Sequence, residues 1–545
     1  MGKICKNCQK EFEITEQDLA FYAKVEVPSP THCPDCRLQR RMAFRNENTL
    51  YKRKCDLCNK DVISTFDVNR SFPVYCMDCW WSDNWDPFAY GQDIDFTRPF
   101  FDQLGELLAR VPKSAFLQLA SENCEYNALI AYSKNTYMSP GSHFMQDSIY
   151  CRKSQYCKDC LDSNLIDHCE LTGFSTNSKN CYACHHIINS RSCVDSAYLK
   201  DCANCKNCFM CSGLVGKSFC IKNQQYSEED YKKYLGLSTQ KAEEEVMNEF
   251  LNFDLQIPKR PLNMANCENS IGDYLYNSKS AIEAYDSIAI EDSKYIFESE
   301  SVKSSMDLLC HDKDIENCYE QSSGGDRNVN VKFSFCPVNC SNSAYLYACF
   351  YLMDSFGCDG FHSRQENVIL NKKYDKATYE SLKNRLVEYM KQTGEWGEFP
   401  SIKIAPNAYN ETMANEYFPL TREQALQKGY TWKDQEEKLN VPATGEIKNS
   451  ILETGDEVVN QIFACKKCGK NYKVLSQEIA LHKKIGVALS AFCPSCRQMN
   501  LMALKNPRKL FDRNCAICNA EIQTTYAPDS LYKVLCEPCY LKTIY

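Results

Sequence analysis

Small and polar residues recur every 12 positions between residues 121 and 222. One column of this repeat holds Cys in five successive units: Cys157, Cys169, Cys181, Cys193 and Cys205. Three positions later, nine successive units hold only Cys, Ser or Thr: Cys124, Thr136, Ser148, Cys160, Thr172, Cys184, Ser196, Cys208 and Cys220. Stacked units of fixed length with small inward residues are typical of a β-solenoid. The pattern predicts a mainly β protein with a central right-handed parallel β-solenoid.

The repeat leaves the coil length open, because one coil can contain either one repeat or two. A coil of one repeat has a perimeter of about 40 Å at about 3.3 Å per residue, which admits only small interior side chains. Alternate rows differ, however. An aromatic column (Tyr126, Tyr150, Phe174, Tyr198) interleaves with a column that is not aromatic (Met138, Asp162, His186, Met210). Because two pseudo-equivalent halves explain this alternation, we favour coils of about 24 residues with a 12-residue pseudo-repeat.

A weaker stretch with the same corner signals follows at residues 264–370. Both stretches end alike, since Asn223 and Tyr226 in one parallel Asn371 and Tyr374 in the other, and each pair opens a charged helical segment. The pattern predicts these segments in order: an N-terminal double zinc-ribbon module (1–96), a linking helix (97–118), a first, Cys-rich solenoid stretch (119–222), a helical insertion (223–263), a second solenoid stretch (264–370), a helical cap and extension (371–432), a flexible acidic linker (433–460) and a C-terminal double zinc-ribbon module (461–545).

The two ends of the chain carry eight Cys-x2-Cys knuckles. The N-terminal set is Cys5/Cys8, Cys33/Cys36, Cys55/Cys58 and Cys76/Cys79, and the C-terminal set is Cys465/Cys468, Cys493/Cys496, Cys515/Cys518 and Cys536/Cys539. The numbers of the second set exceed those of the first by a constant 460. A module of about 75 residues is therefore duplicated without insertion or deletion.

Two knuckles supply the four thiolates of a tetrahedral zinc site, so the 16 cysteines predict four Zn²⁺ per chain. We pair neighbouring knuckles. An interleaved, RING-like pairing and redox dithiols are the alternatives. Four thiolates leave no open position for water, which indicates structural rather than catalytic sites. For the other 20 cysteines we favour buried free thiols in the solenoid over disulfides or further metal sites.

Composition indicates where the protein functions. Its 545 residues include 36 Cys, but neither a run of 18 apolar residues nor a signal-peptide pattern at the N-terminus. Disulfide scaffolds are short exported chains, so we expect a reduced, metal-binding, cytoplasmic protein.

Charge is distributed unevenly along the chain. The net charge is −8, yet residues 461–545 hold 13 Lys/Arg against five Asp/Glu. The candidate binding residues are Arg37, Arg40, Arg41, Arg45, Lys52, Arg53 and Lys54 at the N-terminal end, and Arg497, Lys505, Arg508, Lys509 and Arg513 at the C-terminal end. The spacing of the first four predicts one basic helix face suited to nucleic-acid phosphates. Protein partners, and docking onto the acidic solenoid of the same chain, are the alternatives.

Several of these motifs resemble a known family. They are Cys33 through Cys58, Tyr75-Cys76-x2-Cys79-Trp80-Trp81, the Asn-Ser/Cys repeats and Gly394-Glu-Trp-Gly-Glu-Phe-Pro400. Together they look like the multi-zinc-ribbon, Cys-rich repeat family of candidate-phyla bacteria, and the match spans nearly the whole chain. Members are often labelled class III (CaiB/BaiF) CoA-transferases, but this chain lacks the alternating β-α pattern of those enzymes. Asn500-Leu501 also departs from the family pattern that Arg40-Arg41 follows.

Two functions fit these observations. The first is a zinc-binding scaffold that binds protein partners or nucleic acid, RNA included, through the basic faces of its ribbons. The second is an enzyme, either on a β-helix or a CoA-transferase, and we favour it less. Asp147, Asp159, Asp195 and Asp201 are scattered through the repeats without forming an evident catalytic pair. We expect no catalytic residue and no cofactor other than zinc.

Overall fold

The computed structural model describes residues 1–545 except 125, 239–241, 311–312, 324, 435–440 and 545. Two compact units make up the chain, and each combines segments that are distant in sequence. Unit 1 contains residues 1–117 and 263–435, and unit 2 contains residues 118–262 and 436–545. The N-terminal module (residues 1–96) thus packs with the second solenoid stretch, and the C-terminal module (residues 461–545) packs with the first.

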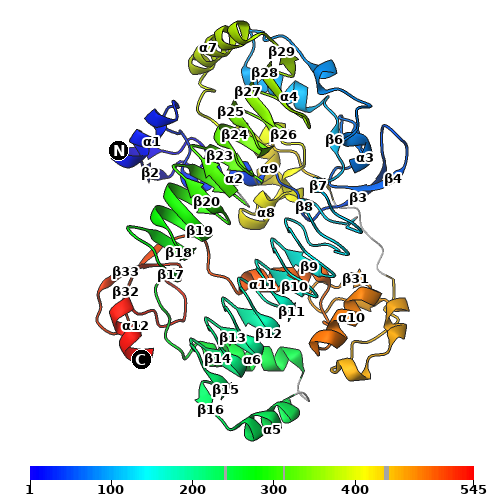
Figure 1. The fold of residues 1–545 in the computed structure, drawn as a ribbon, viewed down its shortest axis with the longest axis vertical. Coiled ribbons are helices and arrows are strands. Elements are labelled where there is room, and N and C mark those ends of the chain that lie inside the picture. Colours follow the sequence, from blue (N-terminus) through cyan, green and yellow to red (C-terminus); the bar gives the residue numbers. More distant parts are fainter. Residues whose placement is uncertain (125, 239–241, 311–312, 324, 435–440, 545) are drawn as a thin grey trace. The chain divides into compact units, whose positions relative to one another are not determined.

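The solenoid of unit 2 is a stack of parallel strands (Figure 1). Its strands are β7 (Gln118–Leu119), β8 (Ile130–Ala131), β9 (Ile149–Arg152), β10 (Leu161–Asn164), β11 (Glu170–Gly173), β12 (Tyr182–Ile188), β13 (Val194–Lys200), β14 (Lys206–Ser212), β15 (Ser218–Ile221) and β16 (Gln224–Gln225). All but the last pairing are parallel, and β16 closes the stack by turning back antiparallel on β15. The helices of this segment are α5 (Glu228–Ser238) and α6 (Glu243–Asp254).

Unit 1 contains the second solenoid. Its strands are β17 (Met264–Ala265), β18 (Ile271–Tyr276), β19 (Lys279–Phe297), β20 (Glu300–Lys303), β21 (Met306–Leu309), β22 (Lys313–Glu316), β23 (Tyr319–Ser322), β24 (Val329–Val338), β25 (Ser341–Ala344), β26 (Tyr347–Phe350), β27 (Leu352–Phe356), β28 (Gln365–Ile369) and β29 (Lys372–Lys373). It ends as the first does, because β29 pairs antiparallel with β28 and leads into helix α7 (Lys376–Thr393). Helices α8 (Met413–Tyr417) and α9 (Arg422–Gln427) complete the extension.

Each coil contains a single repeat, so the expectation of two repeats per coil is wrong. Ile149 pairs with Leu161, and Leu161 in turn pairs with Gly173. In the second solenoid the coil length varies by one residue around this repeat. The coil is one residue shorter at the Met264/Leu275 pair and one residue longer at the Met306/Tyr319 pair. The solenoid class itself is confirmed: residues 118–369 form about 20 turns.

Left-handed corners allow so short a coil to close. Among the described residues of the solenoids nearly every third one has a positive φ, for example +55° at Tyr150, +51° at Lys153, +52° at Tyr156 and +51° at Asp159. Each coil therefore has four corners and four sides. Positive φ is uncommon outside Gly, Asn and Asp, yet large side chains adopt it here at corner after corner.

The corner positions explain why the aromatic column is no guide to the coil length. Tyr150 and Phe174 occupy corners, contact the C-terminal module and are not interior residues. Their alternation with Asp162 and His186 therefore reflects what packs outside the solenoid.

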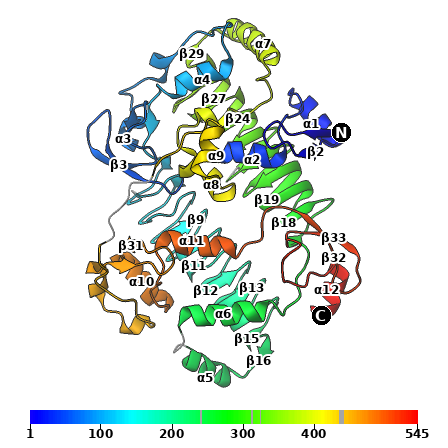
Figure 2. The same cartoon turned by 180° about the vertical axis from the view of Figure 1, so that it is seen from behind.

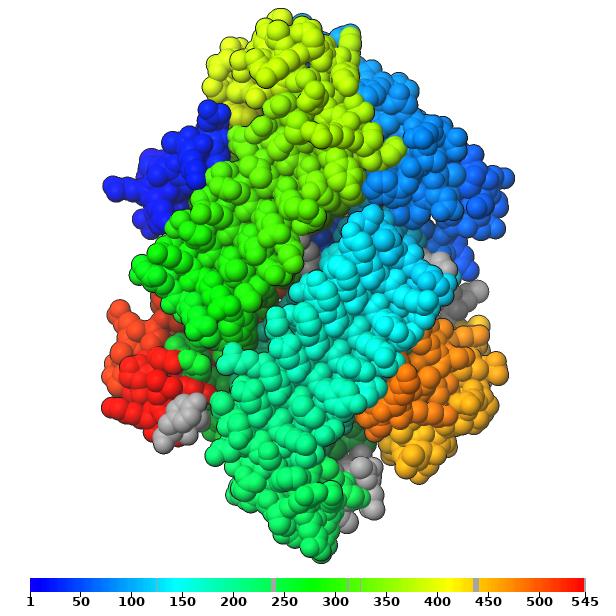
Figure 3. Space-filling view, viewed as in Figure 1, coloured from blue at the N-terminus to red at the C-terminus, as the bar shows by residue number. Residues whose placement is uncertain are grey.

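In the first solenoid, hydroxyls and thiols line most of the interior, with a few aliphatic side chains such as Ile166 and Leu199 among them. Ser154 donates to the carbonyl of Arg152 at 3.0 Å and accepts the backbone N–H of Ile166, one coil later, at 3.3 Å. Ser148 accepts the N–H of Cys160 in the same way at 3.0 Å. The inward hydroxyls thus satisfy backbone groups that the narrow coil buries. Figure 3 shows the coils of residues 118–222 as parallel ridges.

The two modules share one design. The N-terminal module holds β1 (Gly2–Ile4), β2 (Glu11–Glu13), α1 (Glu16–Lys24), α2 (Pro34–Met42), β3 (Tyr51–Lys54), β4 (Asp61–Ser64), β5 (Val74–Tyr75) and α3 (Met77–Trp80). The C-terminal module holds β30 (Phe463–Ala464), β31 (Asn471–Tyr472), α10 (Ser476–Ile485), α11 (Pro494–Ala503), β32 (Phe511–Asn514), β33 (Glu521–Thr524) and α12 (Glu537–Ile544). Both views show α10 and α11 against the first solenoid (Figures 1 and 2).

One connecting segment follows the N-terminal module and another precedes the C-terminal module. The predicted linking helix is α4 (Phe100–Leu108), followed by β6 (Lys113–Ser114). The acidic linker is not free where it is described, because Ile451 and Val458 are buried in the core of the C-terminal module. Its residues 435–440 lie outside the described portion of the chain.

Candidate metal centres

The sixteen knuckle cysteines form four clusters of four thiols. The clusters are Cys5/Cys8/Cys33/Cys36, Cys55/Cys58/Cys76/Cys79, Cys465/Cys468/Cys493/Cys496 and Cys515/Cys518/Cys536/Cys539. Neighbouring knuckles therefore pair as predicted, and the interleaved alternative is wrong. Every one of these thiols is free of a disulfide bond.

The spacing of the sulfur atoms matches tetrahedral coordination. Sγ–Sγ distances between paired knuckles are 3.7 Å for Cys8–Cys33, 3.7 Å for Cys58–Cys76, 3.8 Å for Cys468–Cys493 and 3.6 Å for Cys518–Cys536. A tetrahedral metal bound by four sulfurs at about 2.3 Å sets these edges at about 3.8 Å. The clusters can thus hold a metal ion, because all four sulfurs of each lie within 4.8 Å of one another, and four ligands complete the coordination shell of the ion.

Each cluster combines a hairpin turn with a helix N-terminus. In the first cluster, Cys5 and Cys8 lie in the turn between β1 and β2, and Gln9 follows with φ +61°. The equivalent Gly469 has φ +72°. The second knuckle starts α2, where Cys33 is the N-cap and Pro34 occupies the first helical position. A helix N-terminus favours thiolate over thiol, which suits metal binding.

Backbone N–H groups also stabilise the thiolates. Burial alone raises the pKa of Cys465, but N–H donors including that of Cys493, 3.3 Å from its Sγ, bring the pKa down to about 6. Likewise the pKa of Cys55 is about 7, because N–H donors including that of Cys76, 3.2 Å from Sγ, outweigh burial. In each of these two clusters one thiol therefore has a lowered pKa before a metal binds.

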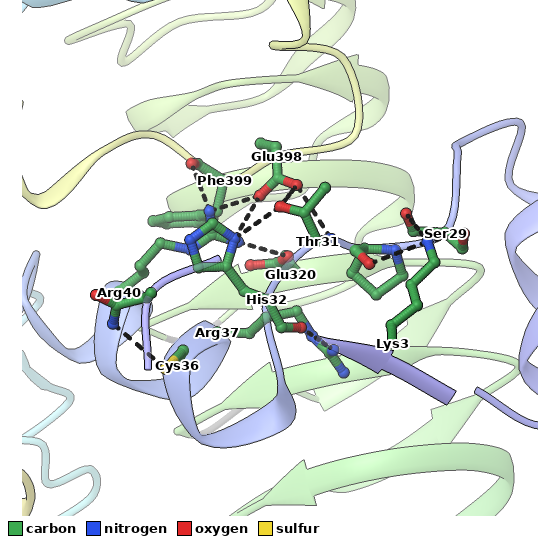
Figure 4. Close-up of polar contacts among 12 residues, drawn as sticks. Lys3, Ser29, Thr31, His32, Cys36, Arg37, Arg40, Glu320, Glu398 and Phe399 are labelled. Atoms are coloured by element: carbon green, nitrogen blue, oxygen red, sulfur yellow. Dashed lines mark hydrogen bonds and ion pairs between the residues drawn. The ribbon is translucent and has the colours of Figure 1, made fainter. Parts of the chain in front are cut away.

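The predicted basic helix face is not exposed, so this expectation is corrected. Arg37, Arg40, Arg41 and Arg45 are all buried. Arg37 Nε lies 2.9 Å from Asp307, and Arg41 lies 3.1 Å from Asp307 and 3.5 Å from Glu320. Arg40 pairs with Glu320 at 3.4 Å and with Glu398 at 2.7 Å (Figure 4). Acidic residues of the second solenoid and its extension therefore neutralise the arginines of α2. This basic face docks within the same chain, which was one of the alternatives expected from the sequence.

The remaining candidate basic residues differ in exposure. Arg45 pairs with Glu47 at 2.5 Å, Arg497 is buried against Asp162 and Glu478, and the mostly buried Arg53 binds Asp56 at 2.8 Å. Lys505, Arg508 and Arg513 are half-buried. Lys52, Lys54 and Lys509 are exposed. The exposed members of the candidate set are thus lysines on or beside the hairpins.

The Gly394–Pro400 motif, whose role is not evident from the sequence, holds unit 1 together. Glu398 accepts from Arg40 and lies 3.1 Å from His32 Nδ1. Glu395 accepts the N–H groups of Phe100 at 2.9 Å and Phe101 at 2.7 Å, which caps α4. The sequence signal that could have indicated this role is the presence of two glutamates and a tryptophan in one short loop.

The 20 solenoid cysteines are free thiols, as predicted. All are buried except the half-buried Cys267. Their thiols donate to carbonyls, as Cys160 does to Lys158 at 3.3 Å. Among the described residues, the groups able to hold a metal ion include none of them.

A pocket of about 510 Å³ lies where the C-terminal module meets the first solenoid. Asp147 and Asp159, which the sequence left unpaired, both line it. Lys484 of α10 pairs with Asp159 at 2.6 Å, and Asn135 donates to Asp147 at 2.7 Å. Asp195 and Asp201 are not among the residues that line this pocket.

A scan against protein-family models finds no match to this chain, and a search of curated proteins finds none either. Among the described residues, no helix combines the length and the apolar composition that crossing a membrane requires. Fold and sites therefore define the class: a β-solenoid protein with four four-cysteine clusters able to hold metal ions, two in each duplicated module.

Proposed function

We propose that this protein is a zinc-stabilised scaffold that binds other proteins. Four closed thiolate clusters at tetrahedral spacing support Zn²⁺ as the bound ion, because Zn²⁺ favours four-coordinate sulfur sites. With four ligands from the protein, each ion has no position left for a substrate. The metal then maintains the fold of each module, and the module in turn is clamped to a solenoid.

The burial of the arginines is the observation that favours a protein partner over nucleic acid. A phosphate-binding face needs guanidinium groups in solvent, whereas Arg37 and Arg41 already pair with Asp307. The exposed lysines of the candidate set are too few to make a basic stripe, and one of them, Lys54, lies 2.9 Å from Asp61.

An exposed aromatic ladder on the first solenoid is the candidate contact surface. It consists of Tyr132, Phe144, Tyr156 and His168, which stack at centroid distances of 4.9, 4.6 and 4.6 Å. The first three are 51 %, 42 % and 40 % exposed. Pairs of opposite charge lie beside it, such as Lys134 with Glu122 at 3.1 Å. Rigid aromatic edges among mixed charges suit a protein interface.

Affinity capture with the metal-loaded full-length protein tests this function. We expect partners that survive nuclease treatment and that the triple variant Tyr132→Ser/Phe144→Ser/Tyr156→Ser loses, with its metal content unchanged. Tyr182→Ser is the matched control, because Tyr182 is 46 % exposed but lies outside the ladder. Partners that disappear with nuclease instead would establish nucleic-acid binding.

The pocket of Asp147 and Asp159 supports a second candidate, ligand binding or catalysis on the solenoid. Two carboxylates and a lysine in one pocket are groups that acid–base chemistry uses. A CoA-thioester assay and a glycan-hydrolysis screen, repeated with Asp147→Asn, test it. Activity that this substitution abolishes would replace the scaffold proposal by an enzymatic one.

A further inference from the structure

A fifth group of metal-ligating side chains lies away from the cysteines, at the joint between the C-terminal module and the first solenoid. It consists of Asp162 at a corner of β10, and Glu478 and His482, which are four residues apart on α10. The three residues are 0 %, 1 % and 0 % exposed. One ligand atom from each lies within 4.8 Å of the other two. Two ligands at about 2.1 Å from one ion are at most about 4.2 Å apart, so a small inward movement completes a site.

The two ring nitrogens of His482 differ in their partners. Its Nδ1 lies 3.1 Å from the carbonyl oxygen of Val487, to which it must donate a proton because a carbonyl only accepts. The neutral ring then carries its lone pair on Nε2, and Nε2 has no hydrogen-bond partner among the described residues. Metal-ligating histidines share this arrangement, with one nitrogen fixed by a carbonyl and the other free. A buried nitrogen without a partner is otherwise costly.

The carboxylates are under-compensated as well. Neither oxygen of Asp162 accepts a hydrogen bond from a described residue, and its closest cation is Arg497, with Nε at 3.3 Å from Oδ1. The same guanidinium binds Glu478 at 2.8 Å. One arginine thus serves two buried carboxylates.

The duplicated module provides an internal comparison. The constant offset between the modules relates Glu478 to Asp18, His482 to Tyr22, Arg497 to Arg37 and Leu501 to Arg41. Asp307 takes the place of Asp162 and accepts from both Arg37 and Arg41. Asp18 has Lys294 at 3.0 Å from both of its oxygens. In unit 1 protein cations therefore satisfy both carboxylates. In unit 2, Leu501 stands where the N-terminal module has Arg41, and His482 stands where it has Tyr22.

We propose that Asp162, Glu478 and His482 bind a divalent transition-metal cation, of the class that includes Zn²⁺ and Mn²⁺. Two carboxylate oxygens and one imidazole nitrogen suit such ions. The cation takes over the charge compensation that Arg41 gives to Asp307 in the other unit. It holds the C-terminal module on its solenoid and adds one metal to the four of the cysteine clusters.

Metal counting on the full-length protein tests this site. With Zn²⁺ as the probe, we expect five bound ions in the wild type, and four in both His482→Tyr and Leu501→Arg. His482→Tyr introduces the residue that the N-terminal module has at the equivalent position, Tyr22. Leu501→Arg introduces the equivalent of Arg41, which supplies a positive charge. Tyr22→His is the matched control. It should leave the count at five, because Arg41 and Lys294 already occupy the charge positions there.

Co²⁺ substitution distinguishes this site from the cysteine clusters, since only thiolate-bound Co²⁺ shows sulfur-to-metal charge transfer. We expect the wild type to bind one Co²⁺ that does not contribute to that band, and Leu501→Arg to lose this ion. Leu501→Arg therefore tests the site even if His482→Tyr fails to fold. A wild-type protein that binds four ions, all by thiolate, overturns the site. So does a fifth ion that persists in folded Leu501→Arg. Neither result affects the cysteine clusters, which the thiolate band reports separately.

Discussion

Arg37 and Arg497 occupy equivalent positions in the two modules and make the same contact. Arg37 lies over the ring of Tyr295 at 5.4 Å and pairs with Asp307, while Arg497 lies over Tyr150 at 5.0 Å and pairs with Asp162. Each arginine directly follows a metal-cluster cysteine on its helix. The metal clusters and the docking contacts are therefore parts of one rigid element, repeated in both modules.

Cys36→Ser should remove one metal ion per chain, because three thiolates and a hydroxyl bind Zn²⁺ far more weakly than four thiolates. Faster amide exchange should follow in residues 1–45. Elemental analysis and mass-resolved exchange measure both effects. Cys193→Ser, at a buried solenoid thiol, is the control and should leave the metal content unchanged. An unchanged metal count in Cys36→Ser would contradict the assignment of its cluster.

Chelation should unfold the modules before the solenoids. A structural zinc contributes about 10–16 kcal/mol to the folding of small modules, whereas the described cores of the two solenoids are built from residues other than the cluster cysteines. Amide protection should disappear in residues 1–79 and 461–545 and persist in β9–β15. Protection of residues 1–79 that survives complete metal removal would show that docking alone maintains the module.

Arg41→Leu should destabilise unit 1 by about 3–5 kcal/mol, because removing one partner of a buried ion network leaves Asp307 and Glu320 under-compensated. The substitution reproduces the residue that the C-terminal module has at position 501. Urea dependence of amide exchange in α2 measures the change. Lys54→Ala is the control. It removes an exposed pair with Asp61 and should cost less than about 1 kcal/mol. Equal effects in the two variants would contradict the network.

Ser154→Val should cost about 1–3 kcal/mol, because the N–H of Ile166 loses its acceptor inside the solenoid. Ser154→Cys should cost less, since a thiol fills the same inward position in other coils and the N–H of Cys169 lies 3.5 Å from Cys157 Sγ. Thermal unfolding followed by circular dichroism measures the difference. A valine variant as stable as the cysteine variant would rule out this hydrogen bond as a stabilising contact.

The docking of the N-terminal module should be sensitive to acid through Glu398. Burial opposes ionisation, but His32 and Arg40 hold the pKa of Glu398 well below its ordinary value. A lowered native pKa gives stability that is present above about pH 4.5 and lost as the pH falls further. Glu398→Gln should therefore weaken α2 protection at pH 7 and show a smaller further loss between pH 5 and pH 3 than the wild type. Parallel losses in the two proteins would contradict this role.

Local rules made the solenoid and the cysteine clusters predictable. The period of 12 is visible in the column of Cys157 and Cys169, and thiolate coordination permits few arrangements of neighbouring knuckles. The coil length was missed because Tyr150 and Phe174 are as consistent with a long coil as with corners that face a partner module. The sequence contains no direct signal for a left-handed corner at a tyrosine.

The arginines show a different limit. Arg37 and Asp307 are separated by 270 residues, and the charge pattern of a helix is the same whether it faces solvent or a buried aspartate. The candidate site of Asp162, Glu478 and His482 was missed for the same reason. Its only local signal is the four-residue spacing of Glu478 and His482, which many helices share.

The crossed pairing of modules and solenoids sets an order for synthesis on the ribosome. The first two metal clusters lie within residues 5–79 and can be loaded as soon as that segment emerges. Asp307 is translated 270 residues after Arg37, which takes roughly 15–55 s at about 5–20 residues per second. During that interval the nascent module carries its arginines uncovered. The arginines of α2 therefore receive their acidic partners only after translation of the second solenoid stretch is under way.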